Sequence, residues 1–285
     1  MSSLLRLVRR LAMLPGIRQL TRFGPLLRLS FALRASLVHE RARFAWNELR
    51  PGARTKTYRL RESGVVIAIR HKTADILVLD ELLSQREYEV PEEIRRGLPP
   101  APRVVDLGAN IGLFGAWILG RFPNAEITGV EADPGNAAVH RLAIAASGTD
   151  RWRLVEGAAA TAPGVLRLAA GAHATSHEAA AGEAAIEVAA IDAFPLLERA
   201  DLIKIDIEGG EWELLGDPRF ATLAPAALVL EYHAAASPEA DARSLVERIL
   251  RRSGFKIVAA GPETVFGTGL VWASATRARR APEGR

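Results

Sequence analysis

The segment Val104-Val105-Asp106-Leu107-Gly108-Ala109-Asn110-Ile111-Gly112 decides the fold of this 285-residue chain. A short apolar strand ends in an acid and a glycine, and apolar residues at helical spacing follow over 111–120. The alternation continues, with helices predicted at 136–147 and 237–253 and strands at 103–107, 126–131, 152–155, 186–188, 201–207, 227–231, 255–260 and 269–274. Alternating strands and helices indicate a parallel sheet with helices on both faces. We therefore predict an α/β fold with a doubly wound, mostly parallel sheet.

The ends of the first two strands predict a ligand site, because open α/β sheets bind ligands beyond the carboxyl ends of their strands. Gly108 and Gly112 allow a sharp turn, but their G-x-x-x-G spacing differs from the dinucleotide fingerprint. Glu131 ends the second strand, where a carboxylate can accept hydrogen bonds from both hydroxyls of a ribose. Asp106 can hold an ammonium group. These acids suit a ligand with a ribose and a positive charge, and S-adenosylmethionine has that chemistry.

Three blocks of the sequence resemble the FkbM-type family of S-adenosylmethionine-dependent methyltransferases. They are V-V-D-L-G-A-N-I-G-L-F at 104–114, G-V-E-A-D-P-G-N at 129–136 and D-L-I-K-I-D-I-E-G-G-E-W-E-L-L at 201–215. The segment R-H-K-T-A-D at 70–75, followed by Glu87-Tyr88, is also similar to the family. The resemblance implies a seven-stranded, Rossmann-like class I methyltransferase sheet whose last strand is antiparallel. It also implies mostly O-methylation of hydroxyls on sugars, glycans, lipids or secondary metabolites, with S-adenosylhomocysteine as the second product.

The resemblance places the cofactor at the ends of the first four strands. The cofactor-binding residues that it implies are Asp106, Gly108, Asn110, Gly112, Glu131, Ala132, Asp133, Glu156, Gly157, Ala158 and Asp206. The first four would line the methionine part, and Glu131 would hold the ribose. Ala132 and Asp133 would lie beside the adenine, whose amino group Glu156 would bind.

The ends of the fourth and fifth strands supply the catalytic candidates, which are Asp206, His233, Glu208 and Lys204. Three mechanisms remain open. His233 or Asp206 is the general base for the acceptor hydroxyl, since an unperturbed histidine pKa near ~6.5 suits that task. Alternatively, Asp206 and Glu231, with Glu208 beside them, hold a divalent cation that acidifies the hydroxyl. In the third mechanism the site only orients the reactants and excludes water. We expect no metal ion.

Structural roles compete with these catalytic ones. Glu208 and Glu211 fit the first turn of a helix, where the helix dipole favours acids. Lys204 fits a structural ion pair, because a buried lysine without a partner is costly.

Other function classes fit the sequence less well. A nicotinamide-dependent oxidoreductase would need the missing G-x-G-x-x-G and Tyr-x-x-x-Lys motifs. A nucleic-acid methyltransferase would need a basic working face, but residues 51–275 carry 23 basic and 30 acidic side chains. The fourth strand also lacks the Asn/Asp-Pro-Pro-aromatic element used on amino nitrogens. A non-catalytic scaffold would not need a pocket formed by Asp106, Gly108 and Glu131. The expected partner is therefore a small-molecule, glycan or lipid acceptor and not nucleic acid.

The net charge of +4 comes from the two ends of the chain, because residues 1–50 carry ten Arg and two Glu. We divide the chain into a basic amphipathic helical region (1–55), a hairpin with helices (56–100), the S-adenosylmethionine-binding domain (101–275) and a basic, disordered tail (276–285). The hairpin strands are predicted at 57–61 and 65–70, with helices at 75–83 and 92–97. Residues 161–185 fit no pattern, and a loop that closes over the ligand is one interpretation of them.

The N-terminal region has two interpretations. Apolar residues recur at helical spacing over 4–14, with Arg6, Arg9 and Arg10 between them, and a second amphipathic stretch covers 25–49. These helices either pack on the main domain or lie on a membrane surface. No stretch of 18 apolar residues occurs, so we expect no transmembrane helix. The expected location is the cytoplasm, with peripheral contact at the inner face of the membrane through residues 1–50 as an alternative.

Overall fold

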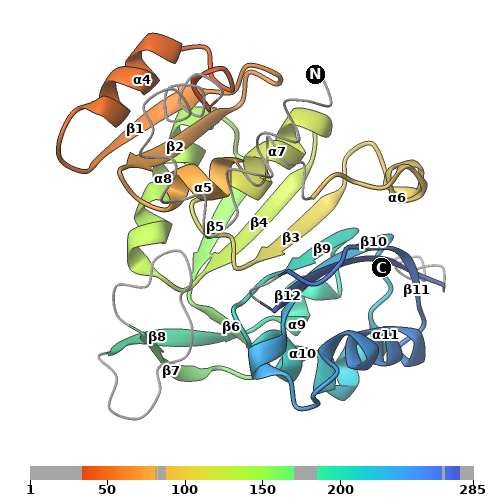
Figure 1. Ribbon diagram of the computed structural model, residues 1–285. Helices are drawn as coiled ribbons and strands as arrows, with labels where there is room; N and C mark the ends of the chain where they lie inside the picture. The colour runs from red at the N-terminus through yellow and green to blue at the C-terminus, as the bar shows by residue number, and fades with distance from the viewer. Residues whose placement is uncertain (1–33, 81, 83–87, 170–184, 265–266, 277–285) are drawn as a thin grey trace.

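The computed structural model of the protein describes residues 34–80, 82, 88–169, 185–264 and 267–276. A seven-stranded sheet lies at its centre (Figure 1). Its strands are β3 (Arg103–Leu107), β4 (Glu126–Glu131), β5 (Trp152–Glu156), β9 (Leu202–Ile205), β10 (Ala227–His233), β11 (Phe255–Ala260) and β12 (Thr268–Ala275). Their order is β11-β12-β10-β9-β3-β4-β5, and only β12 is antiparallel to its neighbours. The predicted mostly parallel sheet with an antiparallel last strand is therefore confirmed.

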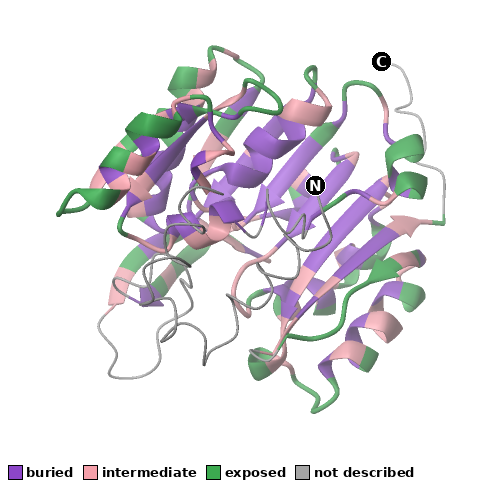
Figure 2. Ribbon diagram, turned by 45° about the horizontal axis from the view of Figure 1, so that its top comes forward, coloured by how far each residue is buried: buried purple, intermediate pink, exposed green. Residues whose placement is uncertain are grey.

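Two hydrophobic cores lie on the two faces of this sheet (Figures 1 and 2). The first core is covered by β1 (Arg54–Arg59), β2 (Val66–His71), α5 (Asp75–Asp80), α6 (Glu92–Gly97), α7 (Leu113–Arg121) and α8 (Pro134–Ser147). The second is covered by α9 (Phe194–Leu197), α10 (Glu211–Gly216), η2 (Pro218–Thr222) and α11 (Ala242–Arg252). The layers are those of a doubly wound α/β fold.

The central strands β3 and β9 are mostly apolar because they are buried on both faces, and their buried polar residues are Asp106 and Lys204. In β3, Val104 packs in the first core and Val105 in the second, and in β9 Leu202 and Ile203 divide in the same way. Successive side chains of a strand point to opposite faces, so a strand that is covered on both sides is apolar at nearly every position. Polar residues are thereby concentrated at the strand ends, where the site forms.

The prediction of a main-sheet strand at 186–188 was wrong. These residues belong to β8 (Ala185–Asp192), which pairs with β6 (Ala158–Ala160) and β7 (Gly164–Ala169) in a separate three-stranded sheet. β7 forms part of the segment that fitted no pattern. The predicted ligand-covering loop in that segment falls partly on residues 170–184, which lie outside the described residues.

The predicted start of the last helix was also wrong. Ser237 follows η3 (Ala234–Ala236), and its hydroxyl donates to the carbonyl of Glu239. The helix α11 begins at Ala242, where the side chain of Asp241 accepts a hydrogen bond from the N–H of Ser244 at 3.0 Å. Aspartate is as good an N-cap as serine, and here it is the residue next to the helix.

The hairpin predicted before the core is confirmed with shifted strand ends, since Arg59 of β1 pairs with Val66 of β2. A helix, α4 (Arg41–Leu49), precedes it, and the predicted helical segments within residues 1–33 lie outside the described residues. The domain boundaries at 55, 100 and 275 stay predictions. Within the described part of the chain, no helix combines the length and the apolar character that crossing a bilayer requires.

Candidate active site

The turn between β3 and α7 has a backbone that only certain residues accept. Gly108 and Gly112 have φ values of 75° and 85°, and Asn110 has a φ of 50°. Left-handed backbone of this kind favours Gly and Asn. A Cβ on Gly108 would lie 1.7 Å from the carbonyl oxygen of Asp206. Glycine at 108 is therefore required for the close approach of the β3 and β9 ends.

Glu131 is buried at the carboxyl end of β4, and both of its oxygens are held by the backbone. Oε2 accepts from the N–H of Asn110 at 2.7 Å, and Oε1 accepts from the N–H of Asp133 at 2.9 Å. Burial raises the pKa of Glu131 to about 7, although these hydrogen bonds favour the charged form. The carboxylate thereby connects the glycine turn to the start of α8, at the place predicted for the ribose.

Asn136 connects Glu131 to the N-terminal hairpin. Its Nδ2 donates to Glu131 Oε1 at 3.3 Å, and its Oδ1 accepts from the Arg70 guanidinium at 2.5 Å. The Arg70 guanidinium also donates two hydrogen bonds, of 2.8 and 3.0 Å, to the Asp75 carboxylate. The segment 70–75, which resembles the family in sequence, therefore helps to hold the Glu131 carboxylate, the predicted ribose ligand, through Asn136.

Lys204 is a buried residue of β9 that pairs with Asp106 of β3, and its ammonium has three acceptors around it. Nζ donates to the carbonyl oxygen of Gly108 at 3.1 Å and lies 3.2 Å from both Asp106 Oδ1 and Asp206 Oδ2. Burial alone would lower the pKa of Lys204, but the charges of Asp106 and Asp206 outweigh it and raise the pKa. Lys204 therefore remains charged and orients two predicted site acids, which agrees with the structural ion pair considered from the sequence.

Tyr88 joins the acids at the ends of β9 and β10. Its hydroxyl lies 2.5 Å from Glu231 Oε2 and 3.3 Å from Asp206 Oδ2. The Tyr88 ring is buried and packs edge-on against Phe114 of α7, which fixes the position of the hydroxyl. The Tyr88 hydroxyl thus helps to position the Asp206 carboxylate. Asp206 is only half-buried, so a ligand can reach it.

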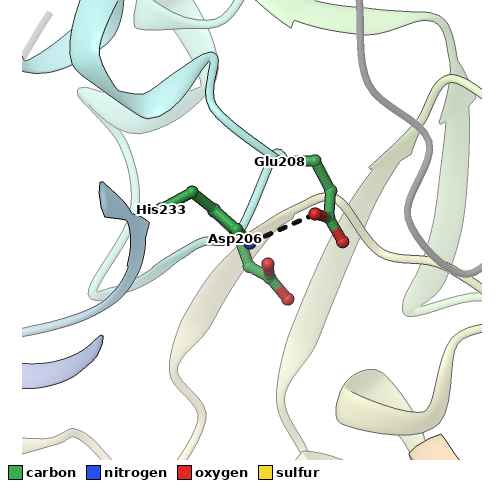
Figure 3. Close-up of side chains that lie close together, drawn as sticks. All are labelled: Asp206, Glu208 and His233. Atoms are coloured by element: carbon green, nitrogen blue, oxygen red, sulfur yellow. Dashed lines mark ion pairs between the residues drawn. The ribbon is translucent and has the colours of Figure 1, made fainter. Parts of the chain in front are cut away.

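His233 lies between two glutamates that follow β9. Its Nε2 is 3.1 Å from Glu208 Oε2, and its Nδ1 is 3.1 Å from Glu211 Oε1 (Figure 3 shows the Glu208 pair). Burial alone would lower the pKa of His233, but the hydrogen bonds to Glu208 and Glu211 outweigh it and raise the pKa to about 11. In this arrangement His233 is a cation at neutral pH. It would become a general base only if a ligand displaced its carboxylate partners.

The same cluster contains the donor atoms for a metal ion. One oxygen each of Asp206 and Glu208 and one nitrogen of His233 lie within 4.8 Å of one another (Figure 3). Carboxylate and imidazole donors suit several divalent cations. The metal ligands considered from the sequence were Asp206 and Glu231, with Glu208 beside them. The structure adds His233 to the candidates, although the His233–Glu208 ion pair already satisfies both side chains.

The remaining predicted cofactor residues surround β4 and β5. Asp133 caps α8, because its Oδ1 accepts from the N–H of Asn136 at 2.8 Å, and Ala132 is half-buried between it and Glu131. Glu156 aligns with Glu131 across the β4–β5 ladder, but its side chain is exposed and pairs with Arg141. Gly157 follows β5, and Ala158 is the first residue of β6. The adenine-binding role of Glu156 stays a prediction.

Three residues of the site were not predicted from the sequence. Tyr88 was noted only as part of a family-like segment, and nothing local indicates that it reaches strand ends more than a hundred residues away. Glu211 was interpreted as a helix-dipole acid, yet it is fully buried and accepts hydrogen bonds from the backbone N–H groups of Gly209 and His233. His140 fills the space beside Gly112 and Gly129, and burial lowers its pKa to about 4.

The described residues fit S-adenosylmethionine. Neither carboxylate oxygen of Asp106 meets hydrogen-bond geometry with a group in the described part of the chain, although the carboxylate is buried beside Lys204. Such a carboxylate can accept hydrogen bonds from the ammonium group of the methionine moiety. In the same site, four carboxylates (Asp106, Asp206, Glu208 and Glu211) share two cationic side chains among the described residues, Lys204 and His233. This excess of negative charge favours a cationic ligand, as a sulfonium is.

Comparisons with known proteins identify the family of the chain. The sequence model of the family described as Methyltransferase FkbM domain matches residues 106–257. Among solved structures, the methyltransferase FkbM from Methylobacillus flagellatus KT is similar at 18% identity, with 86% of this chain and 58% of that chain covered and a TM-score of 0.44. The N,N-8-amino-8-demethyl-D-riboflavin dimethyltransferase RosA from Streptomyces davawensis is similar at 16% identity, with 71% and 56% covered and a TM-score of 0.42. The mitomycin 7-O-methyltransferase MmcR is similar at 18% identity, with 62% and 49% covered and a TM-score of 0.37.

The chain thus spans little more than half the length of the first two of these proteins. The comparison with curated proteins gave no match. The FkbM match covers more than half of the chain and includes the glycine turn, the Glu131 strand and the ends of β9 and β10. With its seven-stranded class I sheet, the protein belongs to the FkbM family of S-adenosylmethionine-dependent methyltransferases.

Proposed function

We propose that this protein methylates a hydroxyl oxygen of a sugar, glycan, lipid or secondary metabolite. The observation that carries the proposal is the pair of acids at the ends of β9 and β10, Asp206 and Glu231, held by the hydroxyl of Tyr88. The pair lies beside Asp106 and Lys204, next to the predicted methionine site. A hydroxyl must lose its proton during methyl transfer, and a positioned carboxylate can accept it.

In this proposal the bound S-adenosylmethionine supplies an electrophilic methyl group on a sulfonium. Asp206 accepts the proton of the acceptor hydroxyl, since it is the half-buried member of the acid cluster that contacts both Lys204 and Tyr88. Lys204 fixes the Asp206 carboxylate relative to Asp106 and the glycine turn. Holding the reacting atoms about 3–3.5 Å apart is itself a large part of the rate enhancement.

His233 has a different role in this proposal from the one considered first from the sequence. Because its two nitrogens face Glu208 and Glu211, it holds the segment after β9 against the end of β10. Trp212 reinforces the same contact, since its indole N–H donates to the carbonyl oxygen of His233 at 3.0 Å. His233 therefore positions the acid cluster, and Asp206 acts as the base.

The chemistry of the site favours oxygen over nitrogen as the acceptor atom. The residues that follow β9 are Asp206-Ile207-Glu208-Gly209, without the Asn/Asp-Pro-Pro-aromatic element associated with amino nitrogens. Carboxylates can also accept hydrogen bonds from several hydroxyls at once, which suits a polyhydroxylated acceptor. A metal ion held by Asp206, Glu208 and His233 is the second mechanism, and it would acidify the same hydroxyl.

The test is methyl transfer from labelled S-adenosylmethionine into an extract of the host, followed by isolation of the labelled product and NMR of the new methyl group. The proposal expects an O-methyl group on a small molecule, glycan or lipid. The Asp206→Asn variant serves as the matched control and should leave that product unlabelled. Label on a nitrogen or in nucleic acid, dependent on Asp206, would contradict the proposed acceptor class.

A further inference from the structure

The outer face of α4 carries an apolar pair that no other described element covers. Trp46 is 60% exposed and Leu49 is 67% exposed, and among the described residues only Leu142 and Val165 are also large, apolar and exposed. Residues three apart in a helix share a face, so Trp46 and Leu49 form one patch. In Figure 1, α4 lies at one end of the molecule, outside the β1–β2 hairpin. We propose that this face of α4 docks onto an anionic membrane surface.

The opposite face of α4 is firmly attached to the protein, so the patch is held in a fixed orientation. Phe44 is fully buried, and Asn47 Nδ2 donates to the hydroxyl of Tyr58 at 3.0 Å. Glu48 Oε2 lies 2.7 Å from Nδ1 of the buried His71. A preorganised surface loses less conformational entropy on binding than a flexible helix does.

The charge around the patch fits an anionic surface. The exposed basic side chains of α4, β1 and their flanks are Arg41, Arg43, Arg50, Lys56, Arg59 and Arg61. The acids nearby are Glu40, whose Oε2 accepts from the Arg59 N–H, the inward-facing Glu48, and Glu62. Residues 63–275 carry 19 basic and 29 acidic side chains. Electrostatic attraction would therefore turn the α4 end of the molecule toward anionic lipid.

A membrane explains the combination of residues better than the other occupants do. Trp and Leu surrounded by Arg form the pattern of an interfacial helix, in which the apolar side chains enter the lipid and the cations contact headgroups. The Arg50 guanidinium lies 5.5 Å from the centre of the Trp46 ring, as part of the same patch. A second copy of the chain would need roughly 1,000 Å² of buried surface, more than the outer face of a nine-residue helix offers. Nucleic acid would bind the arginines through its phosphates, but it would not explain why Leu49 is exposed in the middle of them.

The first experiment measures co-sedimentation of the full chain with vesicles of phosphatidylcholine alone and with about 30 mol% phosphatidylglycerol. The wild-type chain should bind the anionic vesicles, and added salt should weaken the binding. The Trp46→Ser/Leu49→Ser double variant should bind about tenfold more weakly, because two apolar side chains no longer enter the lipid. Leu142→Ser/Val165→Ser is the matched control, since it removes the other two exposed apolar side chains, and it should bind as the wild type does.

The second experiment locates the contact. Trp46 is the exposed tryptophan, while Trp117, Trp152 and Trp272 are buried and Trp212 is half-buried. Brominated phosphatidylcholine in the anionic vesicles should therefore quench wild-type fluorescence and leave the Trp46→Phe variant nearly unquenched. Thermal melting and S-adenosylmethionine binding should be the same for all variants, which separates loss of docking from loss of fold. The proposal is overturned if the wild type ignores anionic vesicles, if the Trp46→Ser/Leu49→Ser variant binds equally well, or if the patch binds RNA and not lipid.

Discussion

Replacing Lys204 by methionine should destabilise the protein strongly, because the change leaves two acids without their shared cation. Lys204 is 3% exposed, and its ammonium lies 3.2 Å from the carboxylates of Asp106 and Asp206. Methionine keeps most of the side-chain volume, so the loss is mainly electrostatic. Breaking a buried ion pair by removing one partner costs about 3–5 kcal/mol. At roughly 2–4 °C per kcal/mol for a chain of this size, Lys204→Met should lower Tm by about 6–20 °C.

Lys256 provides the matched control. Its ammonium pairs with Glu93 at 2.6 Å, but both side chains are more than half exposed, and an exposed pair contributes only about 0–1 kcal/mol. Lys256→Met should therefore leave Tm within a few degrees of the wild-type value, near the ~2–4 °C expected for 1 kcal/mol. Differential scanning calorimetry of both variants makes the comparison with the same substitution in two environments.

The pH dependence gives an independent check. Burial already raises the pKa of Asp106, and loss of the Lys204 charge removes the main effect that opposes this, so the folded variant binds more protons than the unfolded chain does. Stability then falls as pH rises, and the Lys204→Met defect should be smaller at low pH than at neutral pH. A Lys204→Met variant that melts like Lys256→Met, or whose defect does not change with pH, would refute the assignment of Lys204 as the cation that holds the two acids.

Four further predictions concern the site. Glu131→Gln should raise the Kd for S-adenosylmethionine by about 10–100-fold in calorimetry, since charge-assisted hydrogen bonds contribute about 1.5–3 kcal/mol. The same substitution at the exposed Glu126 should leave this Kd unchanged. The pKa of Glu131 is raised to about 7, and ribose hydroxyls donate more strongly to the charged carboxylate. The affinity of the wild type for S-adenosylmethionine should therefore increase from pH 6 to pH 8, while the affinity of Glu131→Gln should not change. Equal pH profiles would place the ribose elsewhere. Asp206→Asn should lower kcat by about 10²–10⁴-fold with the S-adenosylmethionine Kd nearly unchanged, and wild-type turnover would remove Asp206 from the mechanism. Activity should survive prolonged treatment with EDTA, while loss of activity that Mg²⁺ or Mn²⁺ restores would favour the metal mechanism over the carboxylate base. The pKa of His233 is raised to about 11, so its ion pairs stabilise the fold fully below about pH 6.5, and this contribution declines as pH rises to about 11. The His233→Gln variant lacks the contribution. Its urea midpoint should therefore fall less steeply between pH 7 and pH 10 than the midpoint of the wild type.

The central sheet could be predicted from the sequence because its signals are local. The apolar run that ends in Asp106 and Gly108, and the one that ends in Asp206, each mark a strand buried on both faces. The strand at 186–188 was misplaced for the opposite reason. The sequence indicates β8 as a strand, but its place in the separate sheet depends on pairing with β6 and β7, and pairing between strands leaves no signature in the strand itself.

The site was predictable at its strand ends and less so between them. Asp106, Glu131 and Asp206 follow apolar strands, so the topology places them at one edge of the sheet. Tyr88 and Glu211 act through contacts with distant or buried groups, and sequence spacing does not encode these contacts. The charge state of His233 likewise depends on two glutamates that converge on it only in the folded chain.

The contact between Gly108 and the Asp206 carbonyl limits how the donor pocket can be re-engineered. A library that randomises position 108 to admit enlarged donor analogues should return glycine almost without exception, since even alanine would drive the two loops apart. A bulkier donor must therefore be accommodated at other positions of the pocket.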